Sequence, residues 1–319
     1  MRGSLRWTIG GTVSAALSAT SNRVGYVLVG LWLFALAPAS LAEIQLQDAR
    51  AVTLTLPQPA ARIVSLAPHL TELVYAAGAG DLLVGTVNYS DYPAAARQVP
   101  RVGTFDTVNY EALLALRPDL VIAWLSGNGA QTIARLERLG LRVFAEETTD
   151  LDAVAVSLQN LGTLTGRERR AQRAAHDYRQ QLRSLRERFS TAQQLGVYYQ
   201  LWNEPLMTLN DQHIISDVLR LCGGYNVFGG AIPLVSRISM EAVLRADPDV
   251  ILASGMDASR PPWLDDWRAW PTLRAVKNEQ LYYVAPDILQ RHTPRIMQGA
   301  QRVCEHLAKA RAHYFRGSK

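Results

Sequence analysis

The feature of this sequence that most constrains its fold is a segment that occurs twice. The residues EALLALRPDLVIA at 111–123 are matched by EAVLRADPDVILA at 241–253, with each equivalent position 130 residues later. Each copy is typical of a helix, a Pro-Asp turn and a buried strand. A glutamate stands at the start of both copies, where a helix dipole favours a negative charge by about 0.3 to 1 kcal/mol. The repeat therefore predicts two lobes with one helix-to-strand unit each, and it leaves open whether the glutamates serve more than the helix.

Short apolar runs alternate with helical patterns on both sides of the middle of the chain. This order is typical of parallel α/β lobes, in which a helix follows each strand and crosses back over the sheet. The runs lie at 62–66, 84–87, 120–124, 142–144, 196–201 and 250–253. One parallel sheet is therefore predicted in each half of the chain.

A long amphipathic helix is predicted between the two sheets. Six residues recur there at steps of three or four, which is the period of one helix face. They are Ala171, Ala175, Tyr178, Leu182, Leu185 and Phe189. We expect an α/β fold of two Rossmann-like lobes, at 43–149 and 191–319, with a ligand cleft between them. The connecting helical segment, 150–190, holds a single long backbone helix, and such a rigid connector implies modest lobe motion.

The first 42 residues have the features of a secretory signal peptide. They carry Arg2, Arg6 and Arg23 without an acidic residue, then an apolar run at 24–37 and the small-residue exit at 40–42. The run of 14 residues is shorter than the roughly 20 that a membrane-spanning helix needs. No cysteine follows Ala42 to accept a lipid. We predict cleavage near Ala42 and a soluble protein in the periplasm.

Charge and cysteine content narrow the function further. Of 33 basic residues three lie in the leader, and against 28 acidic residues the mature chain carries a formal charge of about +2. Such a balance, without a basic cluster, argues against nucleic acid as a partner. Pairing of Cys222 with Cys304 is the natural expectation in an oxidising compartment, and two free buried thiols are the alternative. The pair would close a loop of 82 residues.

Sequence motifs of common enzymes are missing. The chain contains no G-x-S-x-G elbow, no P-loop, no G-x-G-x-x-G after a strand and no H-E-x-x-H. Its histidines form no H-x-H or H-x-x-x-H pair that would suggest a metal site. They are His69, His176, His213, His292, His306 and His313. We therefore expect a protein that is not an enzyme, with no catalytic residue, no resident metal and no cofactor.

Several short motifs resemble one known family. They are Ala67-Pro68 with Thr71-Glu72-Leu73, Tyr89-Ser90-Asp91-Tyr92-Pro93, the stretch Arg117 to Trp124, Cys222-Gly223-Gly224 and Pro294-Arg295-Ile296. From about residue 62 to 308 the chain resembles the binding proteins with a helical backbone that serve ABC importers. The Tyr-Ser-Asp-Tyr-Pro loop and the cysteine pair are similar to those of the cobalamin branch.

This resemblance implies a periplasmic protein that binds cobalamin or a related corrinoid and delivers it to a membrane permease. An iron-siderophore or haem binder of the same fold is the alternative. A ligand sensor without a role in transport is a second alternative.

The resemblance also implies a set of ligand contacts. Trp124 and Trp202 join the set because they lie at or after strand ends, where an open α/β sheet presents its ligand crevice. The predicted ligand-binding residues are Tyr89, Phe105, Trp124, Trp202, Met207, Val235, Asp287 and Arg291. Met207 and Val235 stand where the family has aromatic residues, so this cleft is expected to be less aromatic, with Trp202 as a replacement face. Arg291, oriented by Asp287, would donate to amide or phosphate oxygens of the ligand.

Two glutamates and the cysteine pair complete the family pattern. Glu111 and Glu241 match the acidic residues that dock onto arginines of the permease, and two equivalent carboxylates suit a two-fold symmetric permease dimer. Cys222 and Cys304 match the family's disulfide. The protein itself is expected to be a monomer. His69 replaces a residue that is not histidine in the cobalamin pattern, which raises the hypothesis that it coordinates the metal of a bound macrocycle.

Overall fold

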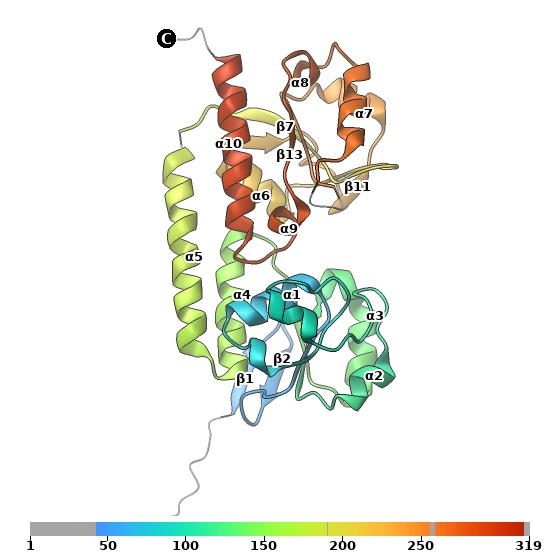
Figure 1. Cartoon of the computed structure of the whole chain (residues 1–319), viewed down its shortest axis with the longest axis vertical. Helices are drawn as coiled ribbons and strands as arrows, with labels where there is room; N and C mark the ends of the chain where they lie inside the picture. Colours follow the sequence, from blue (N-terminus) through green and yellow to red (C-terminus); the bar gives the residue numbers. More distant parts are fainter. Residues whose placement is uncertain (1–42, 190, 256–258, 316–319) are drawn as a thin grey trace, which may run out of the picture. The chain divides into compact units, whose positions relative to one another are not determined.

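The computed structural model describes residues 43–189, 191–255 and 259–315. The predicted signal peptide, 1–42, and its exit lie outside these residues. Within them, none of the helices has both the length and the apolar character that crossing a bilayer requires. The described chain confirms the predicted fold of two α/β lobes (Figure 1).

The first lobe is a parallel sheet of four strands between two layers of helices. The strand order is β4-β3-β5-β6, and every neighbouring pair is parallel. Side chains alternate along β5: Leu120 and Ile122 pack with helices α1 and α4, whereas Val121 and Ala123 pack with α2 and α3 on the opposite face. An antiparallel hairpin, β1-β2, precedes the sheet.

The elements of this lobe have the following bounds: β1 Ile44–Gln47, β2 Thr53–Leu56, β3 Ile63–Ser65, α1 Pro68–Ala76, η1 Gly80–Leu82, β4 Leu83–Gly85, η2 Ala94–Gln98, α2 Tyr110–Ala115, β5 Leu120–Trp124, α3 Leu125–Arg138 and β6 Val143–Glu146.

The second lobe repeats this architecture. Its parallel sheet has the order β10-β7-β12-β13. Along β12, Val250 and Leu252 pack with α6 and α10, whereas Ile251 and Ala253 enter the core beneath α7 and α8. A separate three-stranded antiparallel sheet, β8-β9-β11, has no counterpart in the first lobe.

Its elements have these bounds: β7 Leu195–Gln200, β8 Trp202–Asn203, β9 Leu206–Leu209, α6 Ile214–Leu221, β10 Gly224–Asn226, β11 Val235–Arg237, α7 Met240–Ala246, β12 Val250–Ala253, η3 Pro262–Ala269, α8 Arg274–Lys277, β13 Leu281–Tyr283, α9 Pro286–Leu289 and α10 Ile296–Tyr314.

The sequence repeat is also a repeat of backbone conformation. In each copy the residue directly before the proline has a left-handed backbone, with φ 45° at Arg117 and φ 39° at Asp247. A proline disfavours the right-handed helical conformation in the residue before it, so both helices end before that residue.

The aspartate after each proline anchors the neighbouring strand. Asp119 Oδ2 accepts hydrogen bonds from the backbone N–H groups of Ala61 (3.0 Å) and Arg62 (2.9 Å), at the start of β3. Asp249 Oδ2 accepts one from Gly196 N–H (2.7 Å) in β7. The turn therefore fixes the register of the two central strands in the same way in both lobes.

The connecting segment differs from the prediction in one respect. The predicted amphipathic helix is present as α5, Glu168–Phe189, but a second helix, α4, Leu151–Thr165, precedes it. Gly166, with φ 66°, caps α4 in the left-handed conformation that glycine adopts without strain, and this ends the helix. The two helices lie side by side (Figure 1). The segment 150–190 is thus a helical pair rather than a single helix.

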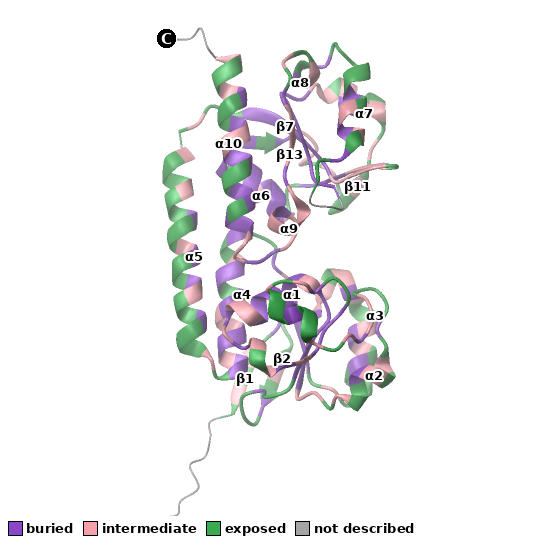
Figure 2. Cartoon of the chain, viewed as in Figure 1, coloured by how far each residue is buried: buried purple, intermediate pink, exposed green. Residues whose placement is uncertain are grey.

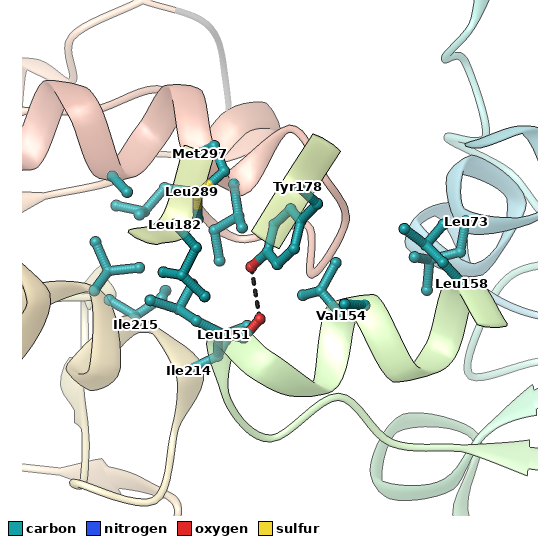
Figure 3. Packing of buried hydrophobic residues seen from close by; sticks show 14 of the residues in the cluster. Leu73, Leu151, Val154, Leu158, Tyr178, Leu182, Ile214, Ile215, Leu289 and Met297 are labelled. Carbon is teal, nitrogen blue, oxygen red and sulfur yellow. Dashed lines mark hydrogen bonds between the residues drawn. The ribbon is translucent and has the colours of Figure 1, made fainter. Parts of the chain in front are cut away.

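One continuous hydrophobic core passes from the first lobe through α4 and α5 into the second. Figure 3 shows Leu73 of α1 beside Leu158 of α4, and Leu182 of α5 near Ile214 of α6. Inside this core the hydroxyl of Tyr178 donates to the backbone carbonyl of Leu151 at 2.7 Å. In Figure 2 the inward side of α5 is buried and its outward side exposed. Because close-packed interiors resist deformation, a shared core favours small movements between the lobes.

Candidate functional site

A cleft of about 510 Å³ is lined by residues of both lobes. It lies where the parallel strands end: Trp124 is the last residue of β5, and Leu201 follows β7 directly. This is the position at which open α/β sheets present ligands. The lining residues are His69, Trp124, Ser126, Leu201, Leu209, His213, Ile215, Pro233, Leu234, Val235, Gln290 and His292.

Three histidines from distant parts of the chain meet in this cleft. His69 lies in the first turn of α1, His213 caps the N-terminus of α6, and His292 lies in the loop between α9 and α10. The ring centroid of His292 is 5.7 Å from that of His69 and 5.2 Å from that of His213. The edge of the His69 ring meets Trp124 at 5.0 Å with an interplanar angle of 88°. Four polarisable rings from the two lobes therefore line the cleft.

Burial keeps these imidazoles neutral. It lowers the pKa of His69 to about 3, with a smaller contribution from the nearby Arg291 guanidinium. Burial also lowers the pKa of His213 to about 4, and it holds the pKa of His292 well below its ordinary value, helped by the two neighbouring histidines. Neutral imidazoles can accept or donate hydrogen bonds and can bind metals through a lone pair.

The histidines do not form a binding site for a free metal ion. Across residues 43–189, 191–255 and 259–315, no group of three or more histidine, cysteine, aspartate or glutamate side chains is placed to hold one. Spacing rules for metal motifs could not have revealed this cluster, because its members are 79 or more positions apart in the sequence.

Arg291 joins the two lobes at the edge of the cleft. Its Nη1 donates to Glu72 Oε1 of the first lobe at 2.7 Å and to Asp91 Oδ1 at 2.7 Å. Its Nη2 lies 3.1 Å from Asp287 Oδ1, the partner expected from the i, i+4 spacing, and donates to the Tyr89 carbonyl at 3.3 Å. Three carboxylates thus hold this guanidinium, where the sequence had suggested one.

Glu72 is the centre of this ion-pair cluster. Its side chain is only 2% exposed. Besides Arg291, it accepts hydrogen bonds from Arg295 Nη1 (3.0 Å) and from the Thr293 hydroxyl (3.1 Å). A buried carboxylate needs such partners, since losing one would leave an uncompensated charge. The Arg295 guanidinium also lies 3.9 Å from the centre of the Tyr92 ring. The predicted Tyr-Ser-Asp-Tyr-Pro loop is therefore tied to the second lobe.

The predicted ligand residues fall into two groups. Trp124 and Val235 line the cleft from opposite lobes. Phe105 is next to Trp124, with ring centroids 6.0 Å apart. Tyr89 is 78% exposed and has a positive φ of 64°. The residues outside the lining of the cleft are Tyr89, Phe105, Trp202, Met207, Asp287 and Arg291.

Trp202 and Met207 lie together in the antiparallel sheet that only the second lobe has. They pair across β8 and β9, and the Trp202 indole N–H donates to the carbonyl of Glu204 at 2.9 Å. That carbonyl is on the same hairpin, so the indole is held beside its own strand. The suggestion that Trp202 replaces a missing aromatic face stays a prediction.

Several cleft residues were not predicted from the sequence. Pro233 and Leu234 belong to the loop before β11, beside Ile232, which is 95% exposed. Leu201, which directly follows β7, could have been found by applying the strand-end rule to every strand of the second lobe, whereas Gln290 ends helix α9. The loop residues carried no such signal, because no periodic pattern relates them to a strand end.

The two repeated glutamates lie on exposed helix starts. Glu111 is in the first turn of α2, which Asn109 caps by accepting from Ala112 N–H at 3.0 Å. Glu241 has the same place in α7, and hydrogen bonds from its own backbone N–H and from Ser239 lower its pKa. Neither carboxylate is buried. Both are accessible to a partner.

Cys222 and Cys304 form the predicted disulfide. It joins the end of α6 to α10, and both cysteines are buried in the core. The crosslink therefore lies entirely within the second lobe.

Comparison with known proteins gives consistent matches. Residues 63–288 match the model of a family described as periplasmic binding protein. The vitamin B12-binding protein of Vibrio cholerae serotype O1 is 40% identical over 252 residues, which cover 79% of this chain and 90% of that protein.

Solved structures match over a similar length. The crystal structure of the periplasmic vitamin B12 binding protein BtuF of Vibrio cholerae is similar with a TM-score of 0.74 at 40% identity, covering 79% of this chain and 98% of that one. A periplasmic heme binding protein from Pseudomonas aeruginosa is similar with a TM-score of 0.69 at 26% identity, covering 82% and 94%.

Proposed function

This chain belongs to the periplasmic binding protein family, and from that premise we propose that it binds cobalamin or a related corrinoid and delivers it to the permease of an ABC importer. The observation that carries the proposal is the lining of the two walls of the cleft. The first lobe presents the rings of His69 and Trp124, and the second presents the rings of His213 and His292 together with aliphatic side chains such as Leu209 and Val235.

The chemistry of a corrinoid suits these walls. A corrin is a large flat ring with apolar faces and a rim of amides. Binding such a ring needs apolar plates on both faces and a few polar groups at the edge. Ser126 and Gln290 supply polar side chains among the lining residues. Aliphatic side chains of the second lobe contact the corrin ring, whereas the family pattern has aromatic residues at the positions of Met207 and Val235.

Arg291 is proposed to contact the polar rim or the phosphate of the ligand. Its ion pairs with Glu72 and Asp287 keep the guanidinium oriented at the edge of the cleft. Charge-assisted hydrogen bonds from arginine are among the stronger contacts to phosphate and carbonyl oxygens. Glu72 belongs to the first lobe and Arg291 to the second, so this ion pair joins the two lobes.

The docking surface is proposed to consist of Glu111 and Glu241. Both carboxylates are exposed, and each stands at the same point of the repeated unit in its own lobe. A permease with two-fold symmetry would present equivalent cationic sites to the two lobes. Since binding and docking use different surfaces, the protein can remain loaded while it docks.

Chemical catalysis is not part of the proposal. The relatives are named as binding proteins, and we propose that this chain captures its ligand and releases it unchanged. Transport would then be driven by ATP hydrolysis in the importer.

A direct test is calorimetric titration of the secreted protein with cyanocobalamin, haem and a ferric hydroxamate siderophore. We expect saturable one-to-one binding of cyanocobalamin, and no comparable binding of the other two. Glu111→Gln with Glu241→Gln serves as a control and should leave the affinity unchanged, because these residues lie outside the cleft lining. Preferential binding of haem or of the siderophore would contradict the proposal and favour another branch of the same fold.

A further inference from the structure

His69 lines the cleft, and its ring nitrogens have no hydrogen-bond partner among the described residues. The residue follows the Ala67-Pro68 turn that leads from β3 into α1, and it lines the cleft. Neither ring nitrogen of His69 is among the fully buried side-chain atoms that lack a partner, so both keep some exposed surface. The perpendicular contact with Trp124 at 5.0 Å fixes the plane of the ring instead. An unused polar atom at the floor of a binding cleft points to a role with the ligand.

The other two histidines of the cleft cannot take this role as they stand. His213 Nδ1 accepts a hydrogen bond from Ile215 N–H at 3.2 Å, so the neutral ring carries its proton on Nε2 and has no lone pair there. His292 hydrogen-bonds to the backbone of Thr148, and its Nδ1 is buried without a partner and inaccessible to a ligand. Only His69 combines access to the cleft with an unused lone pair.

We propose that His69 supplies an axial nitrogen ligand to the cobalt of a bound corrinoid, so that the cleft favours corrinoids with an exchangeable axial water. This inference rests on the proposed function. A free ion would need several protein ligands, which the described residues do not bring together. Cobalt in a corrin already has four equatorial nitrogens, so a single imidazole is enough.

The coordination step is a simple ligand exchange. The lone pair of the His69 nitrogen forms a Co–N bond while the Co–O bond to the axial water breaks and the water leaves. The cobalt keeps its oxidation state, and no proton is released because both imidazole and water are neutral. Burial keeps the ring in the required form, since it lowers the pKa of His69 to about 3.

Visible spectroscopy gives a direct test, because the corrin absorption bands respond to the axial ligands. We would titrate the protein with diaquocobinamide and aquocobalamin, which carry exchangeable water, and with cyanocobalamin, whose two axial positions are filled. The expected result is a shift of the bands of both aquo forms on binding. Cyanocobalamin should bind with its spectrum almost unchanged.

Variants separate coordination from simple packing. His69→Ala should abolish the shift and weaken the binding of diaquocobinamide at least about tenfold relative to cyanocobalamin (about 1.4 kcal/mol). His69→Gln, which keeps a polar side chain of similar size, should behave in the same way and guards against a folding defect in the alanine variant. His176→Gln is the matched control: this histidine is exposed on α5 and lies outside the cleft lining, so the shift should persist.

The outcomes are distinct. A shift that persists in both His69 variants overturns the inference, as does corrinoid binding by the natural protein without any shift of the aquo forms. In the latter case the proposed function still stands. If no corrinoid binds at all, the proposed function fails and the inference fails with it.

Discussion

The two lobes share a scaffold but differ in what they contribute to the cleft. Both have the same order of parallel strands, the same left-handed residue before a proline, and the same strand anchor in Asp119 and Asp249. The first lobe adds His69 and the indole of Trp124 at its strand ends, whereas the second adds two histidines, an extra antiparallel sheet and aliphatic loop residues. The repeated parts decide where the cleft is, and the parts that are not repeated decide what it can hold.

The repeat is also unequal in its interior. β5 pairs Trp124 with Glu146 at the end of β6, so the first lobe buries a carboxyl group there. In the second lobe the residue after β13 is Val284, which is buried and apolar. The disulfide occurs in the second lobe alone. The lobes should therefore respond differently to reduction and to pH, although they present equivalent glutamates.

The largest effect is expected from reversing both docking charges. Glu111→Arg with Glu241→Arg should reduce ligand uptake by intact cells to background, because like charges facing each other at an interface cost several kcal/mol. Ligand affinity in solution should not change. The paired variant Asp177→Arg with Glu168→Arg, on α5, controls for the change in net charge. If the docking variant loses ligand binding, or if either single reversal has no effect on uptake, the two lobes do not dock equivalently.

The next effect concerns the disulfide. Replacing Cys222 and Cys304 by serine opens a loop of 82 residues and should lower the free energy of unfolding by up to about 4 kcal/mol. Urea unfolding of the two forms measures this difference. Hydrogen exchange should show the loss of protection first in α6 and α10, the helices that the disulfide joins. Equal loss in both lobes would instead show that the shared core makes them one cooperative unit.

A pH-dependent effect is expected in the first lobe. Burial raises the pKa of Glu146 to about 7, above the ordinary value of 4.5. Between these pH values the folded protein holds a proton that the unfolded chain has released. The stabilisation by this group is therefore complete below about pH 4.5, and up to about 3 kcal/mol of it is lost as the pH rises to about 7. Glu146→Gln should remove this component from the pH dependence of urea midpoints. Glu168→Gln, at an exposed position, is the control, and equal pH profiles for all three proteins would refute the prediction.

The smallest effect compares the two strand anchors. Asp249 is buried and lies 2.6 Å from an Arg274 guanidinium nitrogen, whereas Asp119 is partly exposed. Asp249→Ala should therefore cost about 2 to 3 kcal/mol of unfolding free energy and Asp119→Ala about 1 kcal/mol. Chemical denaturation of the single variants checks the difference. Equal losses of unfolding free energy in the two variants would contradict the prediction that the buried aspartate contributes more than the partly exposed one.

Most of the fold could be predicted because its signals are local. The apolar runs marked all four strands of the first parallel sheet and the two central strands of the second, β7 and β12, but not its edge strands β10 and β13. The six-residue stripe at 171–189 marked α5. The helix α4 was not separated from it, since α4 packs against the first lobe and α5 together and most of its faces are apolar. A buried helix lacks the alternation of polar and apolar faces from which a helix is recognised. The small sheet β8-β9-β11 was missed because its strands are short.

The sequence by itself determined the two lobes, the repeated turn and the exposed positions of Glu111 and Glu241, because these depend on residues that are neighbours along the chain. Only the tertiary structure decided that His69, His213 and His292 share one cleft, and that Glu72 holds Arg291 from 219 positions away. Such contacts depend on the order of strands in each sheet and on how the two lobes pack against α4 and α5. No periodic pattern in a single chain records that packing, because it is set by the burial of distant surfaces against each other.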